Sequence, residues 1–216
     1  MTFMPGFRHY RTADGNDAFT RLLLHCEGAD GSTTFTDSSA AAHGISAGGF
    51  EVDTAQSKFG SASAFTGSWS TMTSGSHADW SPGTGDFTLD FWIRFSSLGD
   101  IAIFTIDVSD GFFLDYNHGS PGQLRLGRNA VAHDLSGNWS PSTGTWYHVA
   151  VSRSGTTMRI FVDGSQLASG TVSSNYAQGD LRIGNYGASV WMDEIRWSKG
   201  IARWTSGFTP PTAAYG

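Results

Sequence analysis

Residues 87–95 read FTLDFWIRF, and this stretch decides the fold. Alternate positions hold the large apolar side chains Phe87, Leu89, Phe91, Ile93 and Phe95. Successive side chains of an extended chain point to opposite faces, so these five share one face. A period of two with an apolar face predicts a β-strand whose one face is buried.

The same alternation recurs along the chain between turn signals. Residues 146–153, WYHVAVSR, repeat it, and the turn residues 154–157, SGTT, predict a hairpin into residues 158–162. Further strands are expected at 181–184 and 190–197, and no window keeps a helical period. Many short strands joined by Gly- and Pro-containing turns predict an all-β fold, either a sandwich or a barrel.

Composition limits the alternatives. The chain has 216 residues, of which 28 are Gly and 15 are Phe, and only 15% are charged, as suits one β domain. The net charge of −6 and the lack of a basic stripe argue against a nucleic-acid partner. Cys26, in the apolar run 22–26, is the only cysteine, so we expect a buried thiol and no intrachain disulfide.

The N-terminal residues differ from the rest. Residues 1–20 keep no period, and we interpret them as an arm or linker before a domain at 21–216, with an edge strand or a cloning remnant as the alternative. No run is long enough to span a membrane, so no membrane partner is expected. Residues 1–20 show no apolar signal-peptide region, which favours release by lysis, as in a virus particle.

A family resemblance rests on motifs in a fixed order. They are LLLH at 22–25, TFTDSS at 34–39, SKFGSAS at 57–63, FTLDFWI at 87–93, WYHVAV at 146–151, IFVDG at 160–164, MDEIR at 192–196, ARWT at 202–205 and FTPP at 208–211. In this order the chain resembles the laminin-G-like jelly rolls of the concanavalin A-like lectin/glucanase superfamily, over residues 21–213. The resemblance implies an all-β jelly roll, that is, a two-sheet antiparallel β-sandwich.

The residues of the motifs at 22–39 and 202–211 resemble those of modules in bacteriophage tail and other virion proteins, and in large bacterial surface proteins. It implies a non-catalytic structural or adhesion module. The leading expectation is a bacteriophage virion component, a tail, fibre or capsid-decoration protein, whose partners are other virion proteins or its own copies, such as a trimer, and a cell-surface glycan. The alternative is a calcium-assisted carbohydrate-binding module of a bacterial surface or secreted protein, located outside the cell or on its surface.

Sugar sites in this fold use aromatic platforms with polar neighbours, because an aromatic ring covers the apolar face of a pyranose. The candidates beside expected loops are Trp69, Trp80, Tyr116, Asn117, Trp139, Tyr176 and Tyr186. For each aromatic residue the alternative is packing, with Trp80 and Trp139 filling gaps at the bases of loops.

Calcium is the cofactor that the resemblance implies. Carboxylates that it would bring near one sheet edge are Glu27, Asp30, Asp37 and Asp193. The alternative is that Asp193 binds backbone amides at the start of its strand. No Cys/His cluster is visible in the sequence, so a zinc site is not expected.

Catalysis is not expected. Glycoside hydrolysis needs two opposed carboxyl groups, whereas Asp193 and Glu194 are adjacent and Asp90 stands alone in its strand. No G-x-S-x-G nucleophile motif occurs, and His25 and His148 read as structural strand residues.

Overall fold

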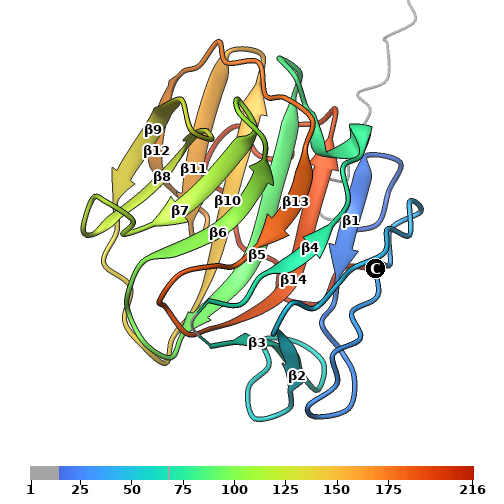
Figure 1. Cartoon of the computed structure of the whole chain (residues 1–216). Coiled ribbons are helices and arrows are strands. Elements are labelled where there is room, and N and C mark those ends of the chain that lie inside the picture. Colours follow the sequence, from blue (N-terminus) through green and yellow to red (C-terminus); the bar gives the residue numbers. More distant parts are fainter. Residues whose placement is uncertain (1–14, 68) are drawn as a thin grey trace, which may run out of the picture.

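A computed structural model describes residues 15–67 and 69–216. In this part of the chain two antiparallel sheets pack face to face, with one 3-10 helix, η1 (Ala78–Trp80) (Figure 1). The predicted all-β sandwich is confirmed. Among the described residues, no helix has the length and apolar character needed to cross a membrane.

One sheet has eight strands, in the order β12-β11-β10-β5-β14-β3-β2, with β1 also paired to β14. Its strands are β1 (Thr20–Leu24), β2 (Glu51–Asp53), β3 (Ser63–Thr66), β5 (Phe87–Phe95), β10 (Trp146–Ser154), β11 (Thr157–Val162), β12 (Ser165–Thr171) and β14 (Val190–Lys199). The hairpin expected at 154–157 is present, since Ser154 pairs with Thr157.

The second sheet has six strands, in the order β4-β13-β6-β7-β8-β9. Its strands are β4 (Met72–Ser74), β6 (Ile101–Asp107), β7 (Phe112–Tyr116), β8 (Gln123–Arg128), β9 (Ala132–Asn138) and β13 (Asp180–Ile183). The core lies between the sheets, where the apolar face of β5 is fully buried. At its centre the rings of Phe104 and Trp197 stack with centroids 5.3 Å apart.

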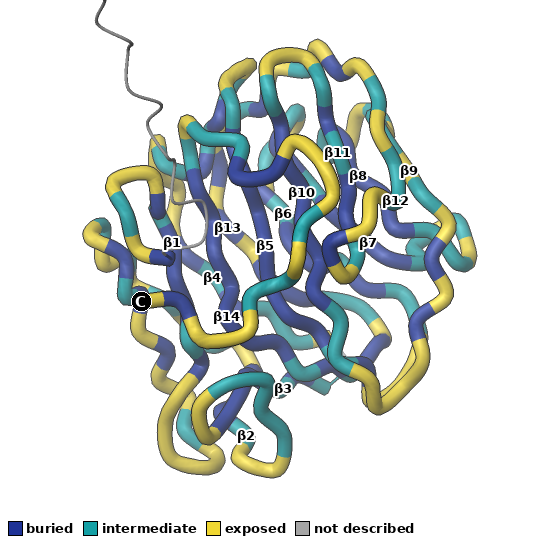
Figure 2. The backbone as a smooth tube through the Cα atoms, turned by 180° about the vertical axis from the view of Figure 1, so that it is seen from behind, coloured by how far each residue is buried: buried dark blue, intermediate teal, exposed yellow. Residues whose placement is uncertain are grey.

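The outer face of β5 is also buried, whereas the sequence pattern predicted burial of one face only. The C-terminal segment, residues 200–216, runs across the outer side of the eight-stranded sheet (Figure 2). The rings of Trp204 and Phe208 stack at 4.1 Å and pack against Phe161 of β11. This cover explains why polar residues between the apolar ones of β5, such as Thr88, are fully buried.

A buried ion pair lies beneath this segment. Asp90 of β5 and Arg196 of β14 form a two-pronged contact at 3.0 and 3.1 Å, and both are 0% exposed. The Tyr215 hydroxyl donates to Asp90, and the Arg196 guanidinium lies 3.7 Å from the centre of the Tyr215 ring. Burial alone would raise the pKa of Asp90, but Arg196 and His148 outweigh it and lower this pKa to about 2.

Residues 15–20 pack onto the domain. Asp17 receives hydrogen bonds from the Arg203 guanidinium, the Asn16 amide donates to the carbonyl of Gly216, and Thr20 begins β1. The arm expected at 1–20 therefore does not extend to residue 20, and its first 14 residues lie outside the described part of the chain.

The buried pair predicts a large effect of Asp90→Asn. The change leaves Arg196 charged and without its anionic partner in the interior, which costs roughly 3–5 kcal/mol. Urea unfolding measures the loss. Asp107→Asn is the matched control, because its pair with Arg182 is exposed and should cost under about 1 kcal/mol. Equal losses in the two variants would contradict the assignment.

The lowered pKa of Asp90 predicts acid sensitivity. The folded state favours the ionised form of Asp90 more than the unfolded chain does. The stabilisation from this ionised group is therefore complete above the ordinary pKa of 3.8 and is lost as the pH falls toward about 2. The loss from this group should reach about 2 kcal/mol. Urea unfolding across this range should show a steeper decline in the wild type than in Asp90→Asn, and parallel curves would refute the interpretation.

Candidate functional site

A cavity of about 520 Å³ opens on the outer face of the six-stranded sheet. Strands β6, β7, β8, β9 and β13 contribute to its walls and floor, and residues 118–119, 129–130 and 184–186 form its rim. Strand alternation puts its lining in place: in β7, Phe112 and Leu114 enter the core, whereas Phe113 and Asp115 line the cavity. The volume falls within the range of small-ligand sites, roughly 300–1,000 Å³.

Aromatic side chains gather at one edge of the cavity. The rings of His118 and Tyr186 stack at 4.4 Å with their planes 19° apart, and Trp69 meets Tyr186 edge-on at 5.8 Å. The Trp69 amide donates to the carbonyl of Tyr186, which ties the two loops together. Trp69 is 72% exposed. We call Trp69, Tyr186 and His118 the aromatic rim.

The backbone at the aromatic rim is unusual. Trp69 has φ 64° and Tyr186 has φ 74°, both in the left-handed region that favours glycine. The side-chain oxygen of Asn185 accepts a hydrogen bond from the Tyr186 amide and helps to hold this turn. Trp69 and Tyr186, two of the aromatic residues predicted from the sequence, therefore meet at one edge although they lie 117 positions apart in the chain.

Charged side chains in the cavity are paired. Arg125 donates to both oxygens of Asp115 at 2.9 Å and also to the His118 carbonyl. Burial raises the pKa of Asp115, although the bonds from Arg125 oppose the rise. Arg182 meets Asp107 at 2.6 Å in a more exposed pair. The cavity thus offers hydrogen-bonding groups from two ion pairs in which opposite charges balance.

The other predicted sugar-binding residues are not exposed platforms. Trp80 and Tyr176 are 0% exposed, and Tyr116 and Trp139 are 5% and 7% exposed. These four rings pack in the core at the ends of the sandwich, the packing alternative given for them, because the loops close over them. Asn117 holds a turn: its side chain donates to Asp100 and accepts from the Gly122 amide.

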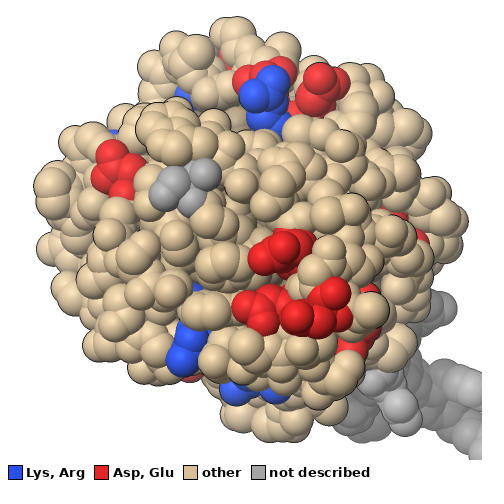
Figure 3. Space-filling model, turned by 60° about the horizontal axis from the view of Figure 1, so that its bottom comes forward, with Lys and Arg blue, Asp and Glu red and all other residues tan. Residues whose placement is uncertain are grey.

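The four carboxylates expected to bind calcium each accept hydrogen bonds from backbone amides. Glu27 binds residue 61, Asp30 binds residue 54, Asp37 binds residues 23, 39 and 43, and Asp193 binds residues 58 and 59. Asp193 thus follows the alternative given for it. Acidic side chains also gather at the bottom of the molecule (Figure 3), but none of the four belongs to a described group close enough to share an ion. Calcium at these residues stays a prediction.

A different group could hold a metal, and the sequence did not reveal it. Ligand atoms of His43, His77 and Asp79 lie within 4.8 Å of one another. The expectation that the chain has no histidine cluster is therefore wrong. His43 lies far from His77 in the sequence, so only the packing of two loops shows that they meet. The charged and aromatic cavity residues of β6–β8 were missed too, although strand alternation indicates which of them face outward.

A comparison with family models places the fold. The model described as the concanavalin A-like lectin/glucanases superfamily matches residues 65–199. The chain belongs to this superfamily. The match runs from β3 to β14 and includes every strand beneath the cavity of this lectin/glucanase-type domain. No curated protein matches the chain in sequence.

Solved structures share the fold of this lectin/glucanase-type domain at low identity. The binding domain of Paraclostridial mosquitocidal protein 1 is 14% identical, with a TM-score of 0.64 over 85% of this chain and 50% of that one. The binding domain of botulinum neurotoxin DC, solved with SialylT, is 14% identical, with a TM-score of 0.65 over 86% and 49%. A Trypanosoma rangeli sialidase, solved with sialic acid, is 14% identical, with a TM-score of 0.62 over 87% and 32%. The chain spans half or less of these chains.

Proposed function

We propose that this domain is a non-catalytic module that binds a glycan in the cavity of its six-stranded sheet. The observation that carries the proposal is the aromatic rim beside a cavity of about 520 Å³. Trp69 exposes most of its surface, and its ring meets that of Tyr186 at the edge of the cavity. An exposed aromatic group beside convergent polar groups is the usual composition of a sugar site.

The charge balance of the cavity favours a ligand rich in hydroxyl groups. Arg182 and Asp107 are about two-fifths exposed, so their remaining donor and acceptor positions can reach a ligand. Arg125 and Asp115 are nearly buried and hold each other in place below. Because neither pair leaves a net charge, the cavity suits neutral hydroxyls that both donate and accept.

Two arrangements of acids support binding rather than glycoside hydrolysis. Asp115 lies opposite Ala102 in the β6–β7 pair, and Asp107 is several residues further along β6, so the two acids are more than about 10 Å apart. Each is bound by an arginine, and hydrolysis uses acids about 5–9.5 Å apart. Asp193 is engaged by backbone amides, and Glu194 by His25 and the Tyr215 amide.

The comparison structures lend support at the level of the fold. The binding domain of botulinum neurotoxin DC was solved in one structure with SialylT and in another with rat synaptotagmin II. The fold is therefore found in complexes with either kind of ligand. The cavity of this chain, with its aromatic rim, favours the sugar.

The setting of the module stays a prediction: a bacteriophage virion, where it would contact other virion proteins or form a homo-oligomer such as a trimer, or a bacterial surface or secreted protein. The motifs behind the virion prediction form β1 with its following turn and the C-terminal segment, which close the fold. They therefore bear more on folding than on setting. Neighbouring capsid, portal or tail genes would support the virion, and a neighbouring hydrolase gene the alternative.

A glycan array probed with the full chain tests the binding proposal. Hits should lose roughly tenfold in affinity in Trp69→Ala and in Tyr186→Ala, since each removes an aromatic contact worth about 1 kcal/mol or more. Phe19→Ala is the matched control, because Phe19 is an exposed aromatic beside β1 of the other sheet and should not change binding.

Calorimetric titration with the best glycan gives the affinities, and circular dichroism checks the fold of each variant. An array without hits would overturn the proposal. So would hits that Phe19→Ala weakens as much as the two rim variants do.

A further inference from the structure

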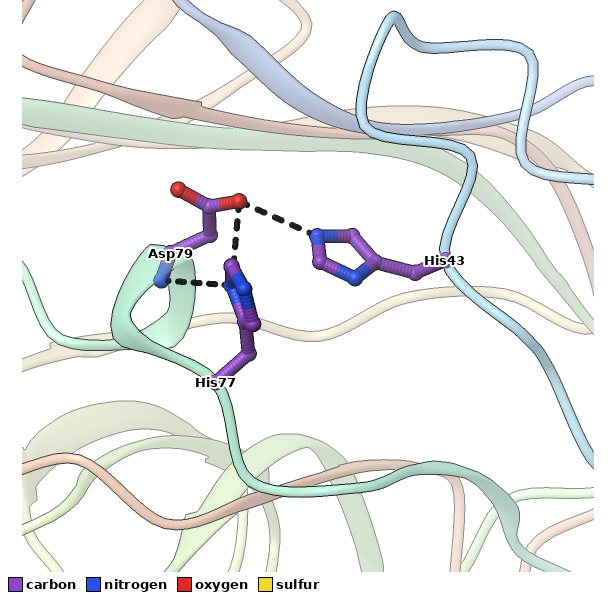
Figure 4. Close-up of side chains that lie close together, drawn as sticks. All are labelled: His43, His77 and Asp79. Carbon is purple, nitrogen blue, oxygen red and sulfur yellow. Dashed lines mark hydrogen bonds and ion pairs between the residues drawn. The ribbon is translucent and has the colours of Figure 1, made fainter.

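His43, His77 and Asp79 meet on the side of the molecule that carries η1 (Figure 4). One oxygen of Asp79, Oδ2, lies 3.1 Å from His43 Nε2 and 3.1 Å from His77 Nδ1. The other oxygen faces Arg21, whose Nε is 3.6 Å away. Two imidazole nitrogens and one carboxylate oxygen therefore lie close together, and the Arg21 guanidinium lies near the second carboxylate oxygen.

The fold holds these side chains in place. His43 follows Ala42, which has φ 49°, and the His43 amide donates to Asp37 at 2.8 Å. His77 directly precedes η1, which carries Asp79. The buried Trp80 ring lies 4.4 Å from the His43 ring. A site that is arranged before an ion arrives loses less entropy when the ion binds.

We propose that His43, His77 and Asp79 bind a divalent transition-metal ion of the zinc class. Four ligands around zinc at about 2.0–2.1 Å stand about 3.3 Å from one another. Asp79 Oδ2 lies 3.1 Å from each histidine nitrogen, and all three ligand atoms lie within 4.8 Å of one another. Imidazole nitrogens with one carboxylate oxygen suit zinc, cobalt or nickel, whereas calcium and magnesium prefer oxygen ligands alone.

His77 Nδ1 has two competing neighbours in Asp79. This nitrogen lies 3.2 Å from the Asp79 amide, a contact that needs a free lone pair, and 3.1 Å from Asp79 Oδ2, a contact that needs a proton. One nitrogen cannot satisfy both. An ion bound by Nδ1 and Oδ2 would use this lone pair in place of the hydrogen bond from the Asp79 amide, and it would remove the repulsion between Nδ1 and Oδ2.

The position of the group indicates what the ion would do. His43 belongs to the segment after β1, and His77 and Asp79 belong to the segment between β4 and β5, so one ion would join two loops. The His77 side chain is 52% exposed, which gives an ion access from solvent. Three protein ligands leave a fourth position for water or for a group of a ligand or partner.

Titration of the full chain, prepared without a histidine tag, tests the proposal. Calorimetry with Zn²⁺ should show one ion per chain, Co²⁺ should give the visible absorption of a tetrahedral site, and Ca²⁺ and Mg²⁺ should not compete. Zinc should also raise the melting temperature. His77→Asn keeps a side-chain acceptor for the η1 amide but removes the imidazole ligand, and His43→Asn removes the other.

Each variant should bind Zn²⁺ at least about 100-fold more weakly, because loss of a direct ligand exceeds the 10–100-fold effect of an outer partner. His133→Asn, an exposed histidine of β9, is the matched control and should bind normally. A wild type that takes up no zinc, or binding that His77→Asn leaves unchanged, would overturn the proposal. If His43→Asn does not fold, His77→Asn at its exposed position decides.

Discussion

The buried ion pair between Asp90 and Arg196 determines where the C-terminal segment must lie. It joins two central strands of the eight-stranded sheet on the face away from the core, beneath the C-terminal segment. An ion pair without water is tolerable only when further polar contacts surround it, and Tyr215 and His148 supply them. The C-terminal segment must therefore close over the sheet for the pair to be sheltered.

The outer faces of the two sheets therefore differ. The chain itself covers the outer face of the eight-stranded sheet, with Trp204 and Phe208 as the apolar part of the cover. The outer face of the six-stranded sheet carries no such segment in the described part of the chain, and there the cavity lies. One of its ion pairs, Arg182 with Asp107, lies where water still competes, so this pair contributes little to folding and remains available to a ligand.

Strand alternation made much of the fold predictable: the apolar face of residues 87–95 and the hairpin at 154–157 follow from short-range chemistry alone. The second buried face of β5 did not, because its cover comes from residues more than a hundred positions later. The exposure of the aromatic residues beside loops could not be predicted either, because it also depends on distant segments. Trp69 stays exposed and Trp80 does not, and only the path of the loops separates them. The meeting of His43 with His77 likewise depends on loop packing.

The left-handed backbone at Trp69 and Tyr186 has an evolutionary consequence. A residue with a β-carbon in this conformation costs roughly 1–2 kcal/mol relative to glycine, which adopts it freely. Selection for thermal robustness alone would replace both residues with glycine. A chain free of this cost would carry glycine at both positions and would lack two of the three rings of the aromatic rim.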